Sequence, residues 1–122
     1  MNVNTYKQGD SANRPWGSWW VYDVMRYAVV KRIEVLPGNR ISLQRHQHRS
    51  ERWIVVEGVA SVIRNEEKII VYPGESVVIP CKCIHRLANE GDSVLVVVEI
   101  QYGNFLSEED IERFNDDYGR QN

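Results

Sequence analysis

Short runs of β-branched and aromatic residues, separated by turn residues, dominate the chain from Trp16 onward. Runs such as "SWWVYDV", "YAVVKRIEVL" and "DSVLVVVEI" are typical of strands. Pro37 with Gly38, and Pro73 with Gly74, mark two of the turns, because proline fixes φ and glycine accepts a positive φ. Turn signals recur about every 8–12 residues, which is the rhythm of a β-sandwich or β-barrel. The pattern therefore predicts an all-β domain.

The C-terminal segment has a different pattern. In "LSEEDIERF", Ser107 is a candidate helix N-cap, and acidic residues up to Asp110 fill the first turn. Ile111 and Phe114 would share one face of such a helix. The first thirteen residues have little pattern. We therefore predict an N-terminal arm over residues 1–13 and one domain over residues 14–122 that ends in a short helix.

Size and charge limit the classes of function. The chain has 122 residues, of which 43% are hydrophobic, and this suits one compact domain with its own core. A net charge of −2 and a pI near 5.9 argue against a dedicated nucleic-acid or anionic-membrane binder. No apolar run approaches the ~20 residues that span a bilayer, and the N-terminus lacks the apolar middle of a secretory signal. We expect a cytoplasmic protein without a nucleic-acid or membrane partner, in which Cys81 and Cys83 are reduced.

A cluster of polar side chains lies in "LQRHQHRSERW", residues 43–53. If "ISLQRHQH" is a strand, Gln44, His46 and His48 point to one face. Glu51 follows a short break and can return beside them, and His85 can face them from across a barrel. A single histidine is as compatible with an ordinary polar role. Together, Gln44, His46, Glu51 and His85 offer two nitrogens and two oxygens, a donor set that suits borderline divalent metals.

These residues resemble the two-part cupin pattern, G-x5-H-x-H-x3,4-E-x6-G followed by G-x5-P-x-G-x2-H-x3-N. The matching positions are Gly38, Gln44, His46, Glu51, Gly58, Gly74, Pro80, His85 and Asn89. Gln44 stands where the pattern has its first histidine, and Lys82 stands where it has a glycine. The resemblance implies a cupin jelly-roll barrel, or double-stranded β-helix. It also implies a divalent metal, with Zn²⁺ expected first and Mn²⁺, Co²⁺, Fe²⁺ and Ni²⁺ left open.

Five blocks of sequence resemble the cupin domain of type II mannose-6-phosphate isomerases, over about residues 14–120: "RPWGSWWVYD", "VVKRIEVLPGNRISLQRHQHRSERW", "IHRLAN", "VEIQYG" and "DIERFNDDYGR". In many relatives this domain is the C-terminal part of an enzyme that is also a mannose-1-phosphate guanylyltransferase. The Gly-rich phosphate-binding stretch of that activity does not occur here, so we expect a stand-alone isomerase domain. The resemblance further implies a homodimer. The chain departs from the family at Gln47 and Arg52, where a histidine is usual.

The implied reaction interconverts mannose 6-phosphate and fructose 6-phosphate. His48 is a candidate for the proton-carrying group, with a solvent-bound histidine at the rim as the alternative. Arg49 and Arg52 are candidates for binding the phosphate of the substrate, with a solvated charged turn as the alternative, and Arg49 is also a candidate catalytic residue. Lys31 shares the inward face of "VVKRIEV" and is a second candidate for the base or for anion binding.

Two other functions stay open. The first is a non-catalytic module that binds sugar phosphates, which the substitutions at Gln47 and Arg52 keep in view. The second is a metal cupin that activates oxygen. Such a site prefers iron with two or three histidines, so Gln44 and the arginine-rich loop weigh against it.

Overall fold

The computed structural model describes residues 3–120, and over this range the chain forms thirteen β-strands and no helix. The strands are β1 (Val3–Asn4), β2 (Ser11–Arg14), β3 (Gly17–Val24), β4 (Ala28–Val35), β5 (Leu43–Arg45), β6 (Arg49–Glu57), β7 (Ala60–Arg64), β8 (Glu67–Val71), β9 (Ser76–Ile79), β10 (His85–Ala88), β11 (Leu95–Gly103), β12 (Phe105–Leu106) and β13 (Glu112–Asn115). The predicted all-β class is confirmed. No helix that could cross a membrane is found within the described range.

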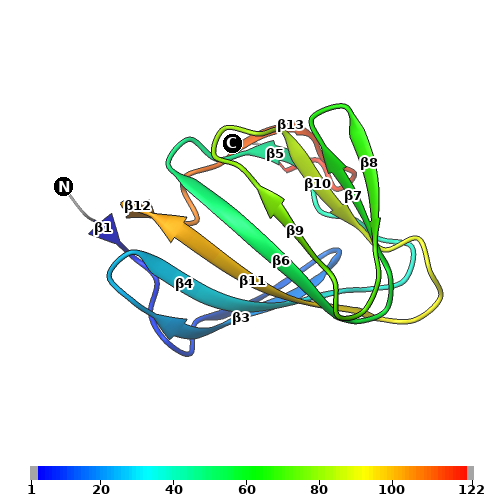
Figure 1. Cartoon of the computed structure of the whole chain (residues 1–122), viewed down its shortest axis with the longest axis horizontal. Helices are drawn as coiled ribbons and strands as arrows, with labels where there is room; N and C mark the ends of the chain where they lie inside the picture. Colours follow the sequence, from blue (N-terminus) through cyan, green and yellow to red (C-terminus); the bar gives the residue numbers. More distant parts are fainter. Residues whose placement is uncertain (1–2, 121–122) are drawn as a thin grey trace.

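Two antiparallel sheets face each other (Figure 1). One has the strand order β2-β3-β4-β11-β6-β9, and the other has the order β13-β5-β10-β7-β8. Several neighbours are far apart in sequence, since β11 lies between β4 and β6, and β10 lies between β5 and β7. This crossing between sheets is the arrangement of a jelly roll.

Alternating side chains build the core between the sheets. On β4, Val29, Ile33 and Val35 are buried, and so is Lys31, which shares their face. Trp53 on β6 and Leu87 on β10 are fully covered from the two sides. The core therefore fills the interior except where inward positions carry polar side chains, and several of these, among them Lys31, Glu51 and Glu99, lie on adjacent strands.

The prediction of a short C-terminal helix is wrong, because this segment forms a turn and the strand β13. The backbone N–H of Glu109 donates to Ser107 Oγ (3.1 Å), which closes a turn instead of capping a helix. The chain then extends as β13 and pairs with β5, with Arg113 opposite Gln44. A helix shorter than about 12 residues is marginal in water, whereas pairing with the open edge of β5 satisfies backbone groups on both strands. The segment therefore forms an edge strand, although its local sequence favours a helix.

The N-terminal residues also join the barrel. β2 pairs with β3 at the edge of the six-stranded sheet, and β1 runs parallel to β12. Between them, the Tyr6 side chain is buried in the core. The segment that looked featureless in sequence thus supplies a side chain to the interior.

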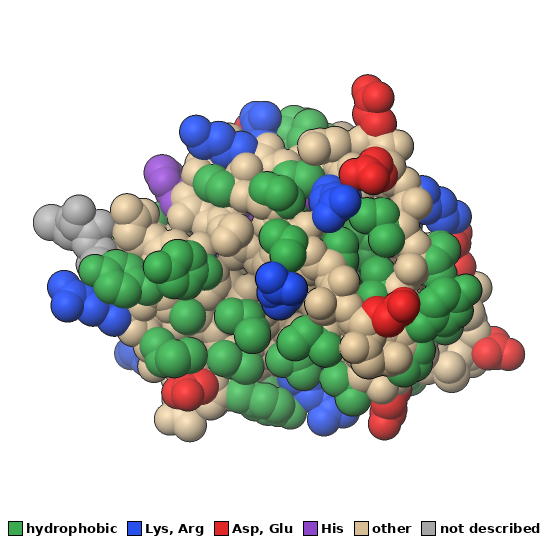
Figure 2. Space-filling view, in the orientation of Figure 1, with side chains coloured by type: hydrophobic (Ala, Val, Ile, Leu, Met, Phe, Trp, Pro, Cys, Tyr) green, Lys and Arg blue, Asp and Glu red, His purple; other side chains and the backbone are tan. Residues whose placement is uncertain are grey.

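The outer face of the six-stranded sheet carries exposed apolar side chains, including Val56 on β6, Val78 on β9 and Tyr102 on β11. Figure 2 shows hydrophobic side chains spread over this side of the molecule, with a basic group among them. The homodimer expected from the sequence stays a prediction.

Candidate metal centre

Polar side chains occupy the inner face of the six-stranded sheet where three strands run side by side. Lys31 on β4 lies opposite Glu99 on β11, which lies opposite Trp53 on β6. Two residues along, Gln101 on β11 is opposite Glu51 on β6. All five side chains are buried. Because strand side chains alternate between faces, the pattern that buries their apolar neighbours also turns these groups inward.

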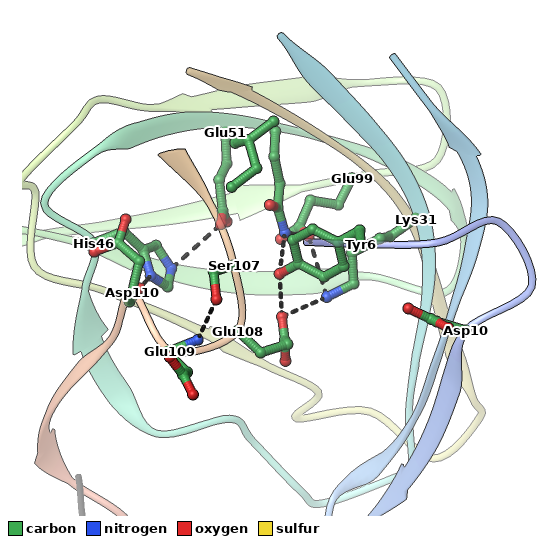
Figure 3. A network of polar contacts seen from close by, with 12 residues as sticks. Tyr6, Asp10, Lys31, His46, Glu51, Glu99, Ser107, Glu108, Glu109 and Asp110 are labelled. Atoms are coloured by element: carbon green, nitrogen blue, oxygen red, sulfur yellow. Dashed lines mark hydrogen bonds and ion pairs between the residues drawn. The ribbon is translucent and has the colours of Figure 1, made fainter. Parts of the chain in front are cut away.

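His46, Glu51 and His85 meet at the edge of this row. Glu51 comes from β6, His85 from β10 of the facing sheet, and His46 from the bend between β5 and β6. Their ligand atoms lie within 4.8 Å of one another, and all three residues are buried. His46 Nε2 is 3.2 Å from Glu51 Oε2, a contact drawn in Figure 3. The structure thus brings together three of the four predicted ligands.

Backbone carbonyls determine that the Nδ1 atom of both imidazoles is protonated. His46 Nδ1 lies 2.7 Å from the carbonyl oxygen of Asp110, and His85 Nδ1 lies 2.9 Å from that of Cys83. A carbonyl only accepts, so each Nδ1 carries a proton, and in the neutral form of either ring Nε2 is the nitrogen with a lone pair. Burial, followed by the influence of Arg49 and His85, lowers the pKa of His46 to about 3, so this ring is neutral at pH 7.

The donor set fits a metal ion. His85 Nε2 is buried and has no hydrogen-bond partner within residues 3–120. Leaving a buried polar atom unpaired costs about 1–3 kcal/mol, so an unpaired buried nitrogen indicates a missing partner such as a metal ion. Two Nε2 lone pairs and one carboxylate, with each ring oriented from behind by a carbonyl, are what a borderline cation such as Zn²⁺ prefers.

Gln44 lies beside the cluster but turns its oxygen away. On β5 it is opposite His85, and its Nε2 is 3.5 Å from His46 Nε2. Its Oε1 accepts a hydrogen bond from Ser42 Oγ (2.8 Å). A half-turn of the amide would present the oxygen to the cluster, and the Ser42 hydroxyl could then accept from the amide nitrogen. Gln44 can therefore serve as a fourth ligand after this rotation.

Arg49 lies behind the cluster and holds Glu51. Its Nε donates to Glu51 Oε2 (2.9 Å), and its Nη1 donates to the carbonyl oxygen of Ser107 (2.9 Å). Burial works against the charge of Arg49, but Glu51 and Tyr6 outweigh burial, and the pKa of Arg49 is raised. A contact between Arg49 and a substrate phosphate, as predicted, would need these bonds to be given up.

Glu51 and Glu99 are neighbouring carboxyl groups whose pKa values are shifted in opposite directions. Trp53 Nε1 donates to both carboxyl groups, at 3.0 Å to Glu51 and 3.1 Å to Glu99. Burial opposes ionisation of Glu51, but Arg49 and His85 outweigh burial and lower its pKa. Burial and the neighbouring Glu51 raise the pKa of Glu99. Glu51 is therefore the more acidic carboxyl group of the pair, and Glu99 takes up a proton more readily than Glu51 does.

A second polar cluster adjoins the first (Figure 3). The Tyr6 hydroxyl donates to Glu108 Oε2, and Lys31 Nζ lies 3.2 Å from the same oxygen and 3.8 Å from Glu99 Oε2. Burial raises the pKa of Tyr6, so its hydroxyl stays protonated. Burial also opposes ionisation of Glu108, but Lys31 and the Tyr6 hydroxyl outweigh burial and lower its pKa. Glu108 is therefore ionised at neutral pH.

A cleft connects this second cluster with the surface. Its lining includes Lys31 and Glu108 from the second cluster, Gln44 from the first, and the ring of Trp19. Lys31 Nζ lies 4.2 Å from the centre of that ring. A small ligand in the cleft would therefore meet a cation, a carboxylate and an aromatic face close to the candidate metal ligands.

Two predicted residues lie elsewhere. The strand β5 ends at Arg45, so alternation does not continue to His48, which is exposed with its ring edge-on to Phe105 at 5.3 Å between centroids. Arg52 is exposed on the outer face of β6, and its Nη1 lies 3.4 Å from Ser76 Oγ. The structure does not bring His48 or Arg52 to the cluster.

Three residues of the site had no clear signal in the sequence. Tyr6 lies in the segment without pattern, while Glu108 and Asp110 lie in the stretch assigned to a helix. The Asp110 carboxylate accepts the backbone N–H groups of Gln47 (2.9 Å) and His48 (3.0 Å). Asp110 therefore fixes the bend that carries His46 with its carboxylate as well as with its carbonyl.

Replacing Asp110 by alanine is expected to weaken Zn²⁺ binding about 10- to 100-fold, the usual effect of removing a group that orients a metal ligand. The bend between β5 and β6 would lose its carboxylate acceptor, while His46 itself remains. Calorimetric titration of the metal-free protein with Zn²⁺ measures the change. Asp117→Ala is the matched control, because this aspartate pairs with Arg40 at the surface. Equal affinities in Asp110→Ala and the control would contradict the expectation.

The sequence matches known proteins along almost its whole length. A family described as "Mannose-6-phosphate isomerase C-terminal" matches residues 1–116. Alginate biosynthesis protein AlgA of Pseudomonas syringae pv. tomato is 48% identical over 109 residues, which cover 89% of this chain and 23% of AlgA. Mannose-1-phosphate guanylyltransferase RfbM of Salmonella typhimurium is 43% identical over 110 residues, covering 90% and 23%. The chain thus spans less than a quarter of the length of these relatives.

The fold also matches solved structures. A protein from Klebsiella pneumoniae with a double-stranded β-helix domain superposes with a TM-score of 0.70 at 16% identity, covering 90% of this chain and 84% of that chain. At this identity the similarity shows the fold alone. The predicted cupin barrel, for which double-stranded β-helix is another name, is confirmed.

Proposed function

The chain belongs to the family of mannose-6-phosphate isomerase C-terminal domains, and from this premise we propose that it is a metal-dependent isomerase of mannose 6-phosphate and fructose 6-phosphate. The convergence of His46, Glu51 and His85 within 4.8 Å is the observation that supports this activity. The group adjoins Gln44, which lines the cleft and has its Nε2 3.5 Å from His46 Nε2. The substrate would be a soluble sugar phosphate, and we propose that the reaction takes place in the cytoplasm.

His46, Glu51, His85 and the rotated Gln44 would hold the metal. Zn²⁺ is the first expectation, and the nitrogen and oxygen donors also accommodate Mn²⁺, Co²⁺, Fe²⁺ or Ni²⁺. When bound, the ion would act as a Lewis acid toward the oxygens on C1 and C2 of the opened sugar and make the adjacent C–H bond more acidic. Arg49 would keep Glu51 ionised and aimed at the ion.

The protein's own groups would then move the proton. Isomerisation takes a proton from C2 of the aldose and returns one to C1. A second proton passes from the C2 oxygen to the C1 oxygen, so the sugar keeps its composition and charge. Glu108 lines the cleft and is ionised, which suits a general base. Lys31 and Tyr6 would position it, since both contact its Oε2. Glu108 therefore takes the role for which the sequence suggested His48.

The test is an assay of fructose 6-phosphate formation by the full chain loaded with Zn²⁺, Mn²⁺ or Co²⁺. Turnover of mannose 6-phosphate should appear with at least one metal, disappear with a chelator and return when that metal is restored. Unphosphorylated mannose, compared at the same concentration, should react more slowly. Tight binding of the sugar phosphate without turnover would point instead to a binding module, and metal-dependent oxygen uptake would point to an oxygenase.

A further inference from the structure

The lining of the cleft carries an excess of positive charge. Besides Lys31, it includes the guanidinium groups of Arg14, Arg113 and Arg120, against the single carboxylate of Glu108. An excess of fixed positive charge in a cleft with apolar walls raises the local concentration of anions. The cleft is therefore suited to an anionic ligand.

The three arginines reach the cleft from separate parts of the chain. Arg14 ends β2 and has its guanidinium 5.8 Å from the centre of the Trp19 ring. Arg113 lies on β13, directly opposite Gln44 on β5. Arg120 follows β13 and is held by Asp116 through two hydrogen bonds of 2.9 and 3.0 Å. Their convergence depends on the pairing of β13 with β5, which replaced the predicted helix.

The guanidinium groups are close enough to affect one another. Burial lowers the pKa of Arg113, and the charge of Arg120 and the charge of Arg14 lower it further. Asp116 and Glu108 act in the opposite direction on Arg113. Like charges held together cost free energy, and a bound anion would offset this cost.

The arginines predicted from sequence are less well placed for this task. Arg49 is buried and donates to Glu51 and to the Ser107 carbonyl. Arg52 is exposed on the opposite face of β6 from Glu51. The cleft arginines, in contrast, line an open space that also contains Gln44 and Glu108.

We propose that Arg14, Arg113 and Arg120 form the subsite for the phosphate group of the substrate. This inference rests on the proposed function for the identity of the ligand, a sugar phosphate. A hexose 6-phosphate carries its phosphate at the end of the chain away from C1 and C2. With the phosphate at the arginines, C1 and C2 extend past Gln44 and Glu108 toward His46.

The first experiment measures binding and needs no turnover. Inorganic phosphate is titrated into the full chain and into the variants Arg14→Gln, Arg113→Gln and Arg120→Gln, and chemical shifts are followed by NMR. Each charge-assisted bond contributes about 1.5–3 kcal/mol, so each variant should bind phosphate roughly 10-fold or more weakly. Arg26→Gln is the matched control, because Arg26 is exposed and stacks on Tyr27 away from the cleft. Phosphate affinities equal to wild type in all three cleft variants would overturn the proposal.

The second experiment measures kinetics with mannose 6-phosphate. The cleft variants should raise KM by a similar factor and change kcat much less, since the phosphate is remote from the reacting carbons. Arg52→Gln is the competing candidate, and a raised KM in Arg52→Gln with normal values in the cleft variants would overturn the subsite. Arg14 is exposed, so Arg14→Gln tests the idea even if a variant of the partly buried Arg113 does not fold.

The two experiments separate the subsite from the reaction. If the wild-type chain turns over no sugar phosphate but the arginine variants lose phosphate binding, the proposed isomerase activity fails and the anion subsite stands. If turnover is normal and the variants neither bind phosphate more weakly nor raise KM, the activity stands and the subsite fails.

Discussion

Replacing Glu51 by glutamine is expected to abolish the proposed isomerase activity and to lower the free energy of unfolding of the metal-free protein by about 3 kcal/mol. It should also weaken Zn²⁺ binding by at least the roughly 10- to 100-fold that is lost when a group behind a metal ligand is removed. The Glu51 carboxylate accepts from Arg49 Nε and Trp53 Nε1 and faces His46 Nε2. Glutamine keeps the shape but loses the charge, so Arg49 would stay buried without its ionised partner.

The size of this stability loss reflects two opposing effects. Removing one partner of a buried ion pair costs about 3–5 kcal/mol. Glu99, however, has its pKa raised by burial and by Glu51, and it could ionise more easily once Glu51 is neutral. Its new charge would compensate Arg49 in part, which favours the lower end of the range.

Urea unfolding in the presence of a chelator measures the stability loss, and calorimetric titration measures the metal affinity. Glu67→Gln is the matched control, because Glu67 forms an exposed ion pair with Arg64 at 3.1 Å. Such surface pairs contribute about 0–1 kcal/mol, and Zn²⁺ binding should not change in this variant. A Glu51→Gln protein that still binds one Zn²⁺ with wild-type affinity would remove Glu51 from the metal site.

The parts of the site that the sequence predicted depend on local regularities. Period-2 alternation on β4 placed Lys31 inward, and the burial of Lys31 agrees with this. The spacing between His46 and Glu51 fits a short hairpin bend. Such a bend is enough to predict that the two side chains lie close together. His85 was only a possible partner across a barrel until the cupin resemblance supported it, because no local rule relates β10 to β6.

The parts that the sequence did not predict depend on long-range pairing. Ser107 and the acidic residues after it have the composition of a helix start, but β13 gains more by pairing with β5 than a short helix gains alone. This pairing brings Asp110 to the bend next to His46 and Arg113 to Gln44. Glu108 meets Tyr6 across 102 positions of sequence, a contact that no periodicity could indicate.

His48 illustrates the opposite error. Alternation predicts that residues 44, 46 and 48 share a face, but only while the strand continues. The strand β5 ends at Arg45, and the chain bends where Asp110 accepts the backbone N–H groups of Gln47 and His48. The bend keeps His48 away from the cluster. A side chain from a different segment, Glu108, lines the cleft instead.

Replacing Glu108 by glutamine is expected to lower kcat about 10²- to 10⁴-fold, the usual contribution of a general base, with little change in KM. One carboxylate oxygen accepts from Tyr6 and contacts Lys31, while the other points away from this network in Figure 3. Glutamine would keep the size of the side chain but remove its negative charge, and with the charge both the ability to take a proton and the ion pair with Lys31. Steady-state kinetics with mannose 6-phosphate measure the effect.

Metal content distinguishes this variant from Glu51→Gln. Glu108 is not among the three residues of the metal cluster, so Glu108→Gln should bind Zn²⁺ as the wild type does while losing turnover. Glu109→Gln, one position along on the exposed turn, should keep both properties. A Glu108→Gln enzyme with kcat within threefold of wild type would exclude Glu108 as the base. Lys31, which lines the cleft and contacts Glu99, would then be the next candidate, and Lys31→Met tests it.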